Sequence, residues 1–150
     1  MDIVVDGLHI RYIDRGPADA RATVLLLHGW GVDGSIYHLI TDHLSDRFRM
    51  VVPDLPGFGG SQEPPAPWTL DDYADFVERF AGKLGLREVV GMGHSNGGRI
   101  LIKLLSRSAS PLSIRKAVLI DSAGVKPRHG PGYYLKIYAF KTAKVFFRLP

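Results

Sequence analysis

A serine between two glycines carries the clearest chemical signal in this sequence. Ser95 is the central residue of Gly-His-Ser-Asn-Gly at 93–97, which follows an apolar run at 89–92 and precedes helical spacing of apolar residues at 100–105. A nucleophile elbow needs a serine at such a strand–turn–helix junction, because the sharp turn holds the hydroxyl clear of the backbone. The two glycines remove side chains that would collide where strand and helix crowd together. The helix start also directs unsatisfied N–H groups and partial positive charge to the place where an oxyanion would form.

A second motif supplies what a serine nucleophile requires. His28-Gly29-Trp30-Gly31 follows a continuous apolar run at 23–27, which predicts a strand covered on both faces. An oxyanion hole needs two backbone N–H groups that converge where negative charge develops. One donor is the residue after the nucleophile, here Asn96, and the other comes from the loop after the buried strand, here Trp30. We therefore predict Ser95 as the nucleophile and these two N–H groups as the oxyanion hole.

Strand signals along the chain indicate the sheet that positions these motifs. Asp6-Gly7 separates two runs of alternating apolar residues, which predicts a β-hairpin over 3–14. Short apolar runs predict further strands at 23–27, 50–52, 89–92 and 117–120. A stretch rich in glycine and proline at 56–67 is predicted to be a loop.

Helix signals fall between these strands. Ser35 is predicted to cap one helix, and Thr69 with Asp72 to form a capping box at the start of another, which Gly85 ends. Strands that alternate with helices form a parallel sheet covered on both faces. The fold class is therefore α/β, a three-layer sandwich with a mostly parallel sheet of about six strands.

Three separated motifs resemble the N-terminal part of an α/β-hydrolase-fold enzyme. They are Leu-Leu-Leu-His-Gly-Trp-Gly at 25–31, Pro-Asp-Leu-Pro-Gly-Phe-Gly-Gly-Ser at 53–61 and Gly-Met-Gly-His-Ser-Asn-Gly-Gly at 91–98. The resemblance covers about residues 3–130 and implies a partial hydrolase core over 1–125, followed by the start of an aromatic and basic lid over 126–150. It also implies hydrolysis of esters or, in related branches, of thioesters, amides or carbon–carbon bonds.

The catalytic histidine is the part of the family pattern that this sequence does not show. The family orders its triad as serine, acid, histidine, and the resemblance places the last two after strands seven and eight, so the chain is expected to end inside the lid. Asp121 follows the last predicted strand, where a minority of the family has the acid; a strand-end cap or turn residue is the favoured alternative. His129 is the only histidine beyond the serine and lies in a loop. His28 and His94 are expected to be structural, and Asp54 to organise turns.

Composition argues against several other kinds of site. The sequence has no cysteine, which excludes disulfides and thiol catalysis, and its histidines match no metal-ligand spacing, so no metal or cofactor is expected. No apolar run approaches the roughly 20 residues that span a bilayer, and a cytoplasmic location is expected.

Net charge is +4, and six basic residues but no acidic one follow Asp121. We interpret them as a solvated helix face, or as a segment whose acidic partners lie elsewhere, rather than as a nucleic-acid or anionic-membrane surface. Residues 91–98 lack the third glycine of a dinucleotide fingerprint and the lysine of a P-loop.

Two functions remain open on this sequence. The first is a serine hydrolase of small acyl substrates, which should be inactive or weak in this chain because a serine without a base is a poor nucleophile at neutral pH. The second is a non-catalytic module that binds small apolar molecules or another chain. Without strands seven and eight, residues 117–120 would form an exposed apolar edge. We therefore expect self-association through that edge or through the lid segment.

Overall fold

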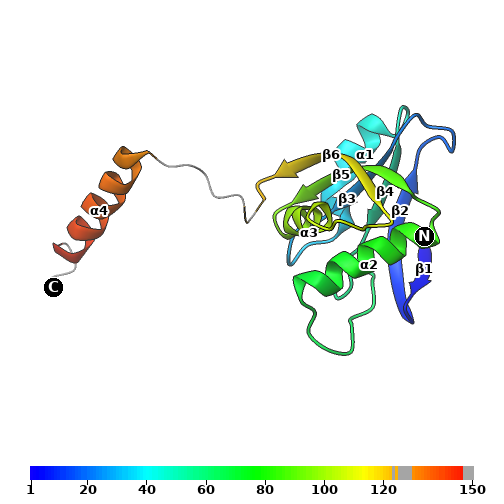
Figure 1. Ribbon diagram of the computed structural model, residues 1–150, viewed down its shortest axis with the longest axis horizontal. Helices are drawn as coiled ribbons and strands as arrows, with labels where there is room; N and C mark the ends of the chain where they lie inside the picture. Colours follow the sequence, from blue (N-terminus) through cyan, green and yellow to red (C-terminus); the bar gives the residue numbers. More distant parts are fainter. Residues whose placement is uncertain (123, 125–129, 147–150) are drawn as a thin grey trace.

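The computed structural model describes residues 1–122, 124 and 130–146. Six strands form one sheet in the order β1-β2-β4-β3-β5-β6 (Figure 1). In chain order they are β1 Asp2–Val5, β2 Leu8–Arg15, β3 Thr23–Leu27, β4 Arg49–Pro53, β5 Glu88–His94 and β6 Ser113–Ile120. β2 runs antiparallel to β1 and β4, whereas β4, β3, β5 and β6 are parallel to one another. The mostly parallel sheet of about six strands is confirmed.

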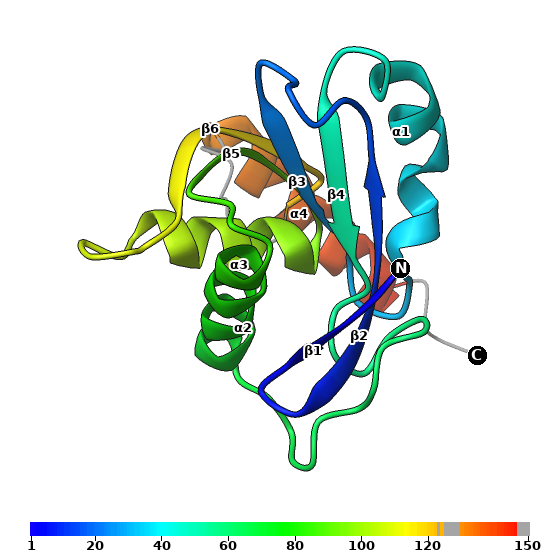
Figure 2. The same cartoon turned by 90° about the vertical axis from the view of Figure 1, so that its right-hand side faces the viewer.

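Helices cover both faces of this sheet, which makes the three layers. The covering helices are η1 Gly34–Tyr37, α1 His38–Leu44, α2 Leu70–Lys83 and α3 Asn96–Leu105, and a further helix, α4 Pro131–Phe146, follows them in the chain. Figure 2 shows α1 on one side of the sheet and α2 with α3 on the other. Alternate side chains of β3 serve the two cores: Leu25 and Leu27 pack in the cluster that includes α2 and α3, and Val24 and Leu26 pack with Tyr37. This alternation explains why β3 is apolar throughout.

Local signals set several of these elements. Asp6 and Gly7 adopt positive φ angles of 51° and 80° in the hairpin turn between β1 and β2. Thr69 and Asp72 form the predicted capping box of α2, with both reciprocal hydrogen bonds present. Gly85, just beyond α2, has a φ of +69°. The local sequence therefore determines both the hairpin and the bounds of α2.

The predicted cap of the first helix is wrong. Asp33, not Ser35, is the N-cap, and its carboxylate accepts the Ser35 backbone N–H at 2.8 Å. The segment begins with the 3₁₀ turn η1, and α1 follows at His38. Asp33 and Ser35 are both good capping residues, so the pattern alone does not distinguish them.

β6 lies at one edge of the sheet and is longer than predicted. It spans Ser113–Ile120 rather than 117–120, and it pairs with β5. Val118, Leu119 and Ile120 are 36–42% exposed there. No helix among the residues described is long and apolar enough to cross a membrane.

α4 is drawn apart from the sheet in Figure 1. Four of its large apolar side chains are exposed: Tyr133, Tyr134, Leu135 and Tyr138. The proposed boundary at 125/126 falls on residues outside the described part of the chain. Both the boundary and the lid assignment therefore stay predictions.

Candidate active site

Ser95 occupies a strained turn between β5 and α3. β5 ends at His94, α3 begins at Asn96, and Ser95 between them has φ 49° and ψ −110°. A non-glycine residue at positive φ is uncommon and costs conformational energy that the surrounding structure must offset. The Ser95 backbone N–H donates to the Ile120 carbonyl at 3.0 Å, which fixes the turn against the end of β6. The side chain is half-buried, and its hydroxyl has no hydrogen-bond partner in the described part of the chain.

The flanking glycines allow this turn to form. A Cβ placed on Gly93 would lie 2.6 Å from the carbonyl carbon of Gly97, and a Cβ on Gly97 would lie 1.9 Å from the Leu27 carbonyl oxygen. The predicted crowding of strand against helix is confirmed. The contact to Leu27 adds something the local motif does not show, because the start of α3 also rests on the backbone of β3.

The loop that follows β3 passes directly over the serine. A Cβ on Gly29 would lie 3.3 Å from the Ser95 Cβ and 2.9 Å from Nδ1 of His94. Trp30 is the next residue, and Asn96 carries one of the N–H groups that α3 leaves without an intrahelical partner. The structure thus brings together Ser95, Asn96 and the loop that contains Trp30. That both N–H groups serve an oxyanion stays a prediction.

His28 holds the loop after β3 in place. It is fully buried; its Nε2 accepts the Leu55 backbone N–H at 2.8 Å, and its Nδ1 lies 2.8 Å from the Gly29 carbonyl oxygen. Nε2 as acceptor leaves the proton on Nδ1, so the ring is neutral. Burial lowers the pKa of His28 below its ordinary value of 6.5. His28 therefore ties the loop after β3 to the residues just beyond β4, which agrees with the structural role expected for it.

The lowered pKa of His28 predicts how stability changes with pH. The unfolded chain protonates this ring below pH 6.5 while the folded chain keeps it neutral, so its contribution is fully present above 6.5. That contribution should fall as the pH drops from 6.5 towards the lowered folded-state pKa, so the free energy of unfolding should be smaller at pH 5.5 than at pH 7.5. Urea unfolding at pH 7.5 and 5.5, combined with NMR titration of the ring, measures this. A titration midpoint for His28 at or above 6.5 would contradict the prediction.

Asp54 organises the neighbouring turns. It is 8% exposed, and its two carboxylate oxygens accept the backbone N–H groups of Gly34 and Gly60, each at 2.8 Å. Its own carbonyl oxygen accepts the Ser61 hydroxyl at 2.7 Å. Asp54 thus joins the loop before η1 to the loop after β4, which agrees with its expected role in organising turns.

Asp121 lies one residue beyond the contact that fixes Ser95. It is exposed, directly follows β6 and has a φ of 44°, a backbone conformation that a strand-end turn residue often adopts. Its carboxylate has no hydrogen bond or ion pair to another described residue. His129, the histidine considered as a base, lies outside the described residues. Within the described ranges, no cluster of three histidine, aspartate or glutamate residues could hold a metal ion.

Sequence reasoning missed an aromatic pocket beside the loop that carries Trp30. Its cavity volume is about 370 Å³, and Trp30, Phe58, Trp68 and Tyr73 contribute to its wall. Phe58 meets Trp30 edge to face, with ring centroids 5.0 Å apart. The only sequence signal was the mixture of prolines and aromatic residues in the loop at 56–68.

Comparison with known proteins identifies one family. A family model described as alpha/beta hydrolase fold matches residues 22–146. Over 129 residues the chain is 33% identical to the dihydrolipoyllysine-residue acetyltransferase component of the acetoin cleaving system of Cupriavidus necator, covering 86% of this chain and 33% of that protein. Over 120 residues it is 31% identical to the pimeloyl-(acyl-carrier protein) methyl ester esterase of Yersinia pseudotuberculosis, covering 73% and 44%.

Among solved structures, a membrane phospholipase A described as a bacterial virulence factor superposes with a TM-score of 0.79 at 32% identity. That alignment covers 93% of this chain and 44% of the phospholipase chain. The chain therefore spans between a third and a half of the length of these relatives.

Proposed function

Because this chain belongs to the alpha/beta hydrolase fold family, we propose that it is a serine hydrolase of carboxylic esters or related acyl bonds. The observation that carries the proposal is the backbone of Ser95, held at positive φ between β5 and α3 directly beneath Gly29. A strained residue that the surrounding structure holds this firmly is typical of a functional site. The esterase and phospholipase named above are consistent with this class of reaction.

The proposed reaction uses the serine hydroxyl and two backbone donors. The Ser95 oxygen attacks the acyl carbon and forms a new C–O bond, while the backbone N–H groups of Trp30 and Asn96 stabilise the negative charge on the carbonyl oxygen. The alcohol leaves with a proton, and water then releases the acyl group as a carboxylic acid. Loss of one such donor costs about 3 kcal/mol of transition-state stabilisation.

The base and the acid of the triad are separate parts of the proposal. None of the described histidines is hydrogen-bonded to Ser95; the rings of His38 and His43 contact backbone carbonyls of their own helical segment. We keep Asp121 as the candidate acid, supported by its place at the end of β6. A site that lacks its triad histidine retains only the catalysis of the oxyanion hole and of binding, about 10³–10⁴-fold in a well-studied protease. The 150-residue chain should therefore turn over esters slowly.

Labelling with a fluorophosphonate probe tests the nucleophile. We expect mass spectrometry after long incubation to find the adduct on the peptide that contains Ser95, and Ser95→Ala to carry none. Ser106→Ala, at the opposite end of α3, is the matched control and should label like the unaltered chain. Equal labelling of the Ser95→Ala chain, or an adduct on another residue, would refute the assignment.

The edge strand β6 supports a second role, self-association. Its exposed residues Val118, Leu119 and Ile120 form an apolar edge of the kind that pairs with another chain. We expect light scattering to show a dimer or larger assembly that Val118→Lys reduces to a monomer. Val4→Lys is the control, because Val4 is equally exposed, at 42%, on β1 at the opposite edge. A monomeric unaltered chain would contradict this role.

Residues 126–150 are proposed as a lid segment. The support is the exposed aromatic surface of α4, whose side chains Tyr134 and Tyr138 are 53% and 68% exposed. Such side chains need an apolar surface to cover. A lid over the surface around Ser95 would provide one.

A further inference from the structure

The aromatic pocket lies beside the loop that carries Gly29 and Trp30, and Trp30 forms part of its wall. A Cβ on Gly29 would lie 3.3 Å from the Ser95 Cβ, and the next residue, Trp30, is 70% exposed and forms one wall of the pocket. Phe58 packs edge to face on Trp30 and also on His28, with centroids 5.0 and 5.6 Å apart. The pocket wall is therefore built on the same buried histidine that ties down the loop after β3.

Trp68 and Tyr73 form another part of the pocket wall, and packing and a hydrogen bond hold them in place. Trp68 meets Tyr73 edge to face at 5.2 Å, and the Tyr73 hydroxyl donates to the Pro56 carbonyl at 3.1 Å. Tyr73 belongs to the first turn of α2, so the capping box that starts this helix also positions the ring. Two edge-to-face aromatic pairs thus line the cavity, and such surfaces favour a flat aromatic ligand through the same offset and edge contacts.

Charge at the pocket comes from one residue. Glu63 is the only charged residue in the lining; it is exposed and forms no ion pair within the described residues. Arg79 shares a neighbouring depression with Glu63, but its guanidinium is bound to Asp6 and lies 4.0 Å from Asp75. The carboxylate of Glu63 is therefore not neutralised by a described cation, and the pocket carries negative charge beside aromatic rings.

We propose that this pocket receives an aryl group without negative charge, on one side of the scissile bond, and that Glu63 disfavours anionic groups there. The placement beside a scissile bond rests on the proposed function, whereas the preference for the ligand rests on the pocket alone. Neutral aryl groups gain the edge and face contacts of Trp30, Phe58, Trp68 and Tyr73. Cationic aryl groups gain the rings and the carboxylate together. An anionic group meets repulsion from Glu63 at short range, which salt weakens.

The two tryptophans of the sequence, Trp30 and Trp68, both line this pocket. Their indole N–H resonances therefore report binding at this site without any turnover. We would titrate the unaltered 150-residue chain with benzamide, benzoate and benzylammonium at low ionic strength. Benzamide and benzylammonium should shift both indole resonances, and benzoate should bind at least about threefold more weakly than benzamide.

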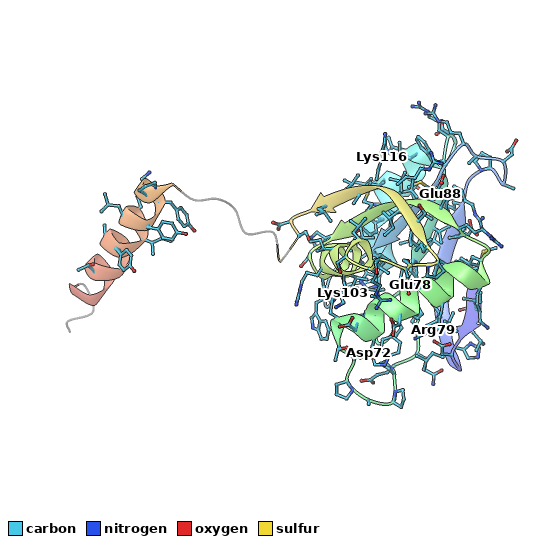
Figure 3. The ribbon with its side chains drawn as sticks, in the orientation of Figure 1. Asp72, Glu78, Arg79, Glu88, Lys103 and Lys116 are labelled. Atoms are coloured by element: carbon cyan, nitrogen blue, oxygen red, sulfur yellow. The ribbon has the colours of Figure 1, made fainter. Side chains whose placement is uncertain are left out.

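Glu63→Gln separates the role of the carboxylate from that of the rings. This variant should bring the affinities for benzoate and benzamide to within about 1.5-fold of each other, as should 0.5 M salt. Glu88→Gln is the matched control, because it removes the same charge from the start of β5, seven residues before Ser95 (Figure 3). It should leave the discrimination unchanged.

Each outcome bears on one of the two proposals. Three results would contradict the proposed ligand preference of the pocket. The indole resonances could respond to none of the three ligands, benzoate and benzamide could bind equally well, or the preference for benzamide over benzoate could survive Glu63→Gln. Those results would leave the labelling of Ser95 untouched. The chain could instead bind the ligands with the expected preference while Ser95 does not react with the fluorophosphonate. That result would support the proposed pocket and contradict the proposed hydrolase activity.

Discussion

Replacing Gly97 by alanine should lower the free energy of unfolding by about 4 kcal/mol, a large part of the 5–15 kcal/mol that stabilises a typical domain. The added Cβ would lie 1.9 Å from the Leu27 carbonyl oxygen and 2.7 Å from that of His28. Both are backbone atoms of β3 and the residue after it, so no flexible side chain can move aside. Overpacking usually costs 1–3 kcal/mol, and the cost rises where backbone itself must shift.

Urea unfolding followed by circular dichroism measures this change. Gly82→Ala is the matched control, because a Cβ there, in the last turn of α2, meets nothing within 4 Å. Alanine has the higher helix propensity, so this control should gain about 0.5–1 kcal/mol. A Gly97→Ala chain within 1 kcal/mol of the unaltered one would mean that α3 does not rest on β3 as closely as described. The same variant should also lose fluorophosphonate labelling, because α3 carries Asn96 and begins next to Ser95.

Elements whose partners lie close in sequence were predictable. The hairpin at Asp6-Gly7 and the capping box of Thr69 and Asp72 are confirmed, because each depends on contacts within four residues. The predicted cap of the first helix was wrong because the true cap depends on a residue far away in the sequence. The choice between Asp33 and Ser35 depends on a 3₁₀ turn whose first residue, Gly34, is held by a carboxylate 20 positions away.

The candidate site was also predictable only where its parts lie close together in the sequence. The elbow around Ser95 was readable because strand, turn and helix are consecutive, and the crowding of its glycines is confirmed. The aromatic pocket was not readable, because its walls come from the loops after β3 and β4 and from the start of α2. Nothing local to Phe58 indicates that its ring packs against both Trp30 and His28. β6 was predicted too short because Ser113 to Lys116 includes polar residues that an edge strand tolerates.

Asp54→Ala should cost about 3 kcal/mol of unfolding free energy. The substitution leaves the backbone N–H groups of Gly34 and Gly60 without their acceptor, and Gly34 is buried away from water. A buried donor left unsatisfied costs about 1–3 kcal/mol, and a hydrogen bond to a charged acceptor lies at the upper end. Asp54→Asn should cost less, because the amide keeps one carbonyl oxygen, but its NH₂ group then faces one of the two donors.

Asp54 also determines how well the loop after β3 is ordered, which gives the variant a second measurable effect. Its bond to Gly34 fixes the far end of the segment that carries Trp30, while His28 fixes the near end. We therefore expect Asp54→Ala to slow fluorophosphonate labelling of Ser95 even under conditions where the chain remains folded. Asp46→Ala, an exposed aspartate near the end of α1, should change stability by less than about 0.5 kcal/mol and leave labelling unchanged. If Asp54→Ala were as stable and as reactive as Asp46→Ala, the loop after β3 would have to be held by His28 alone.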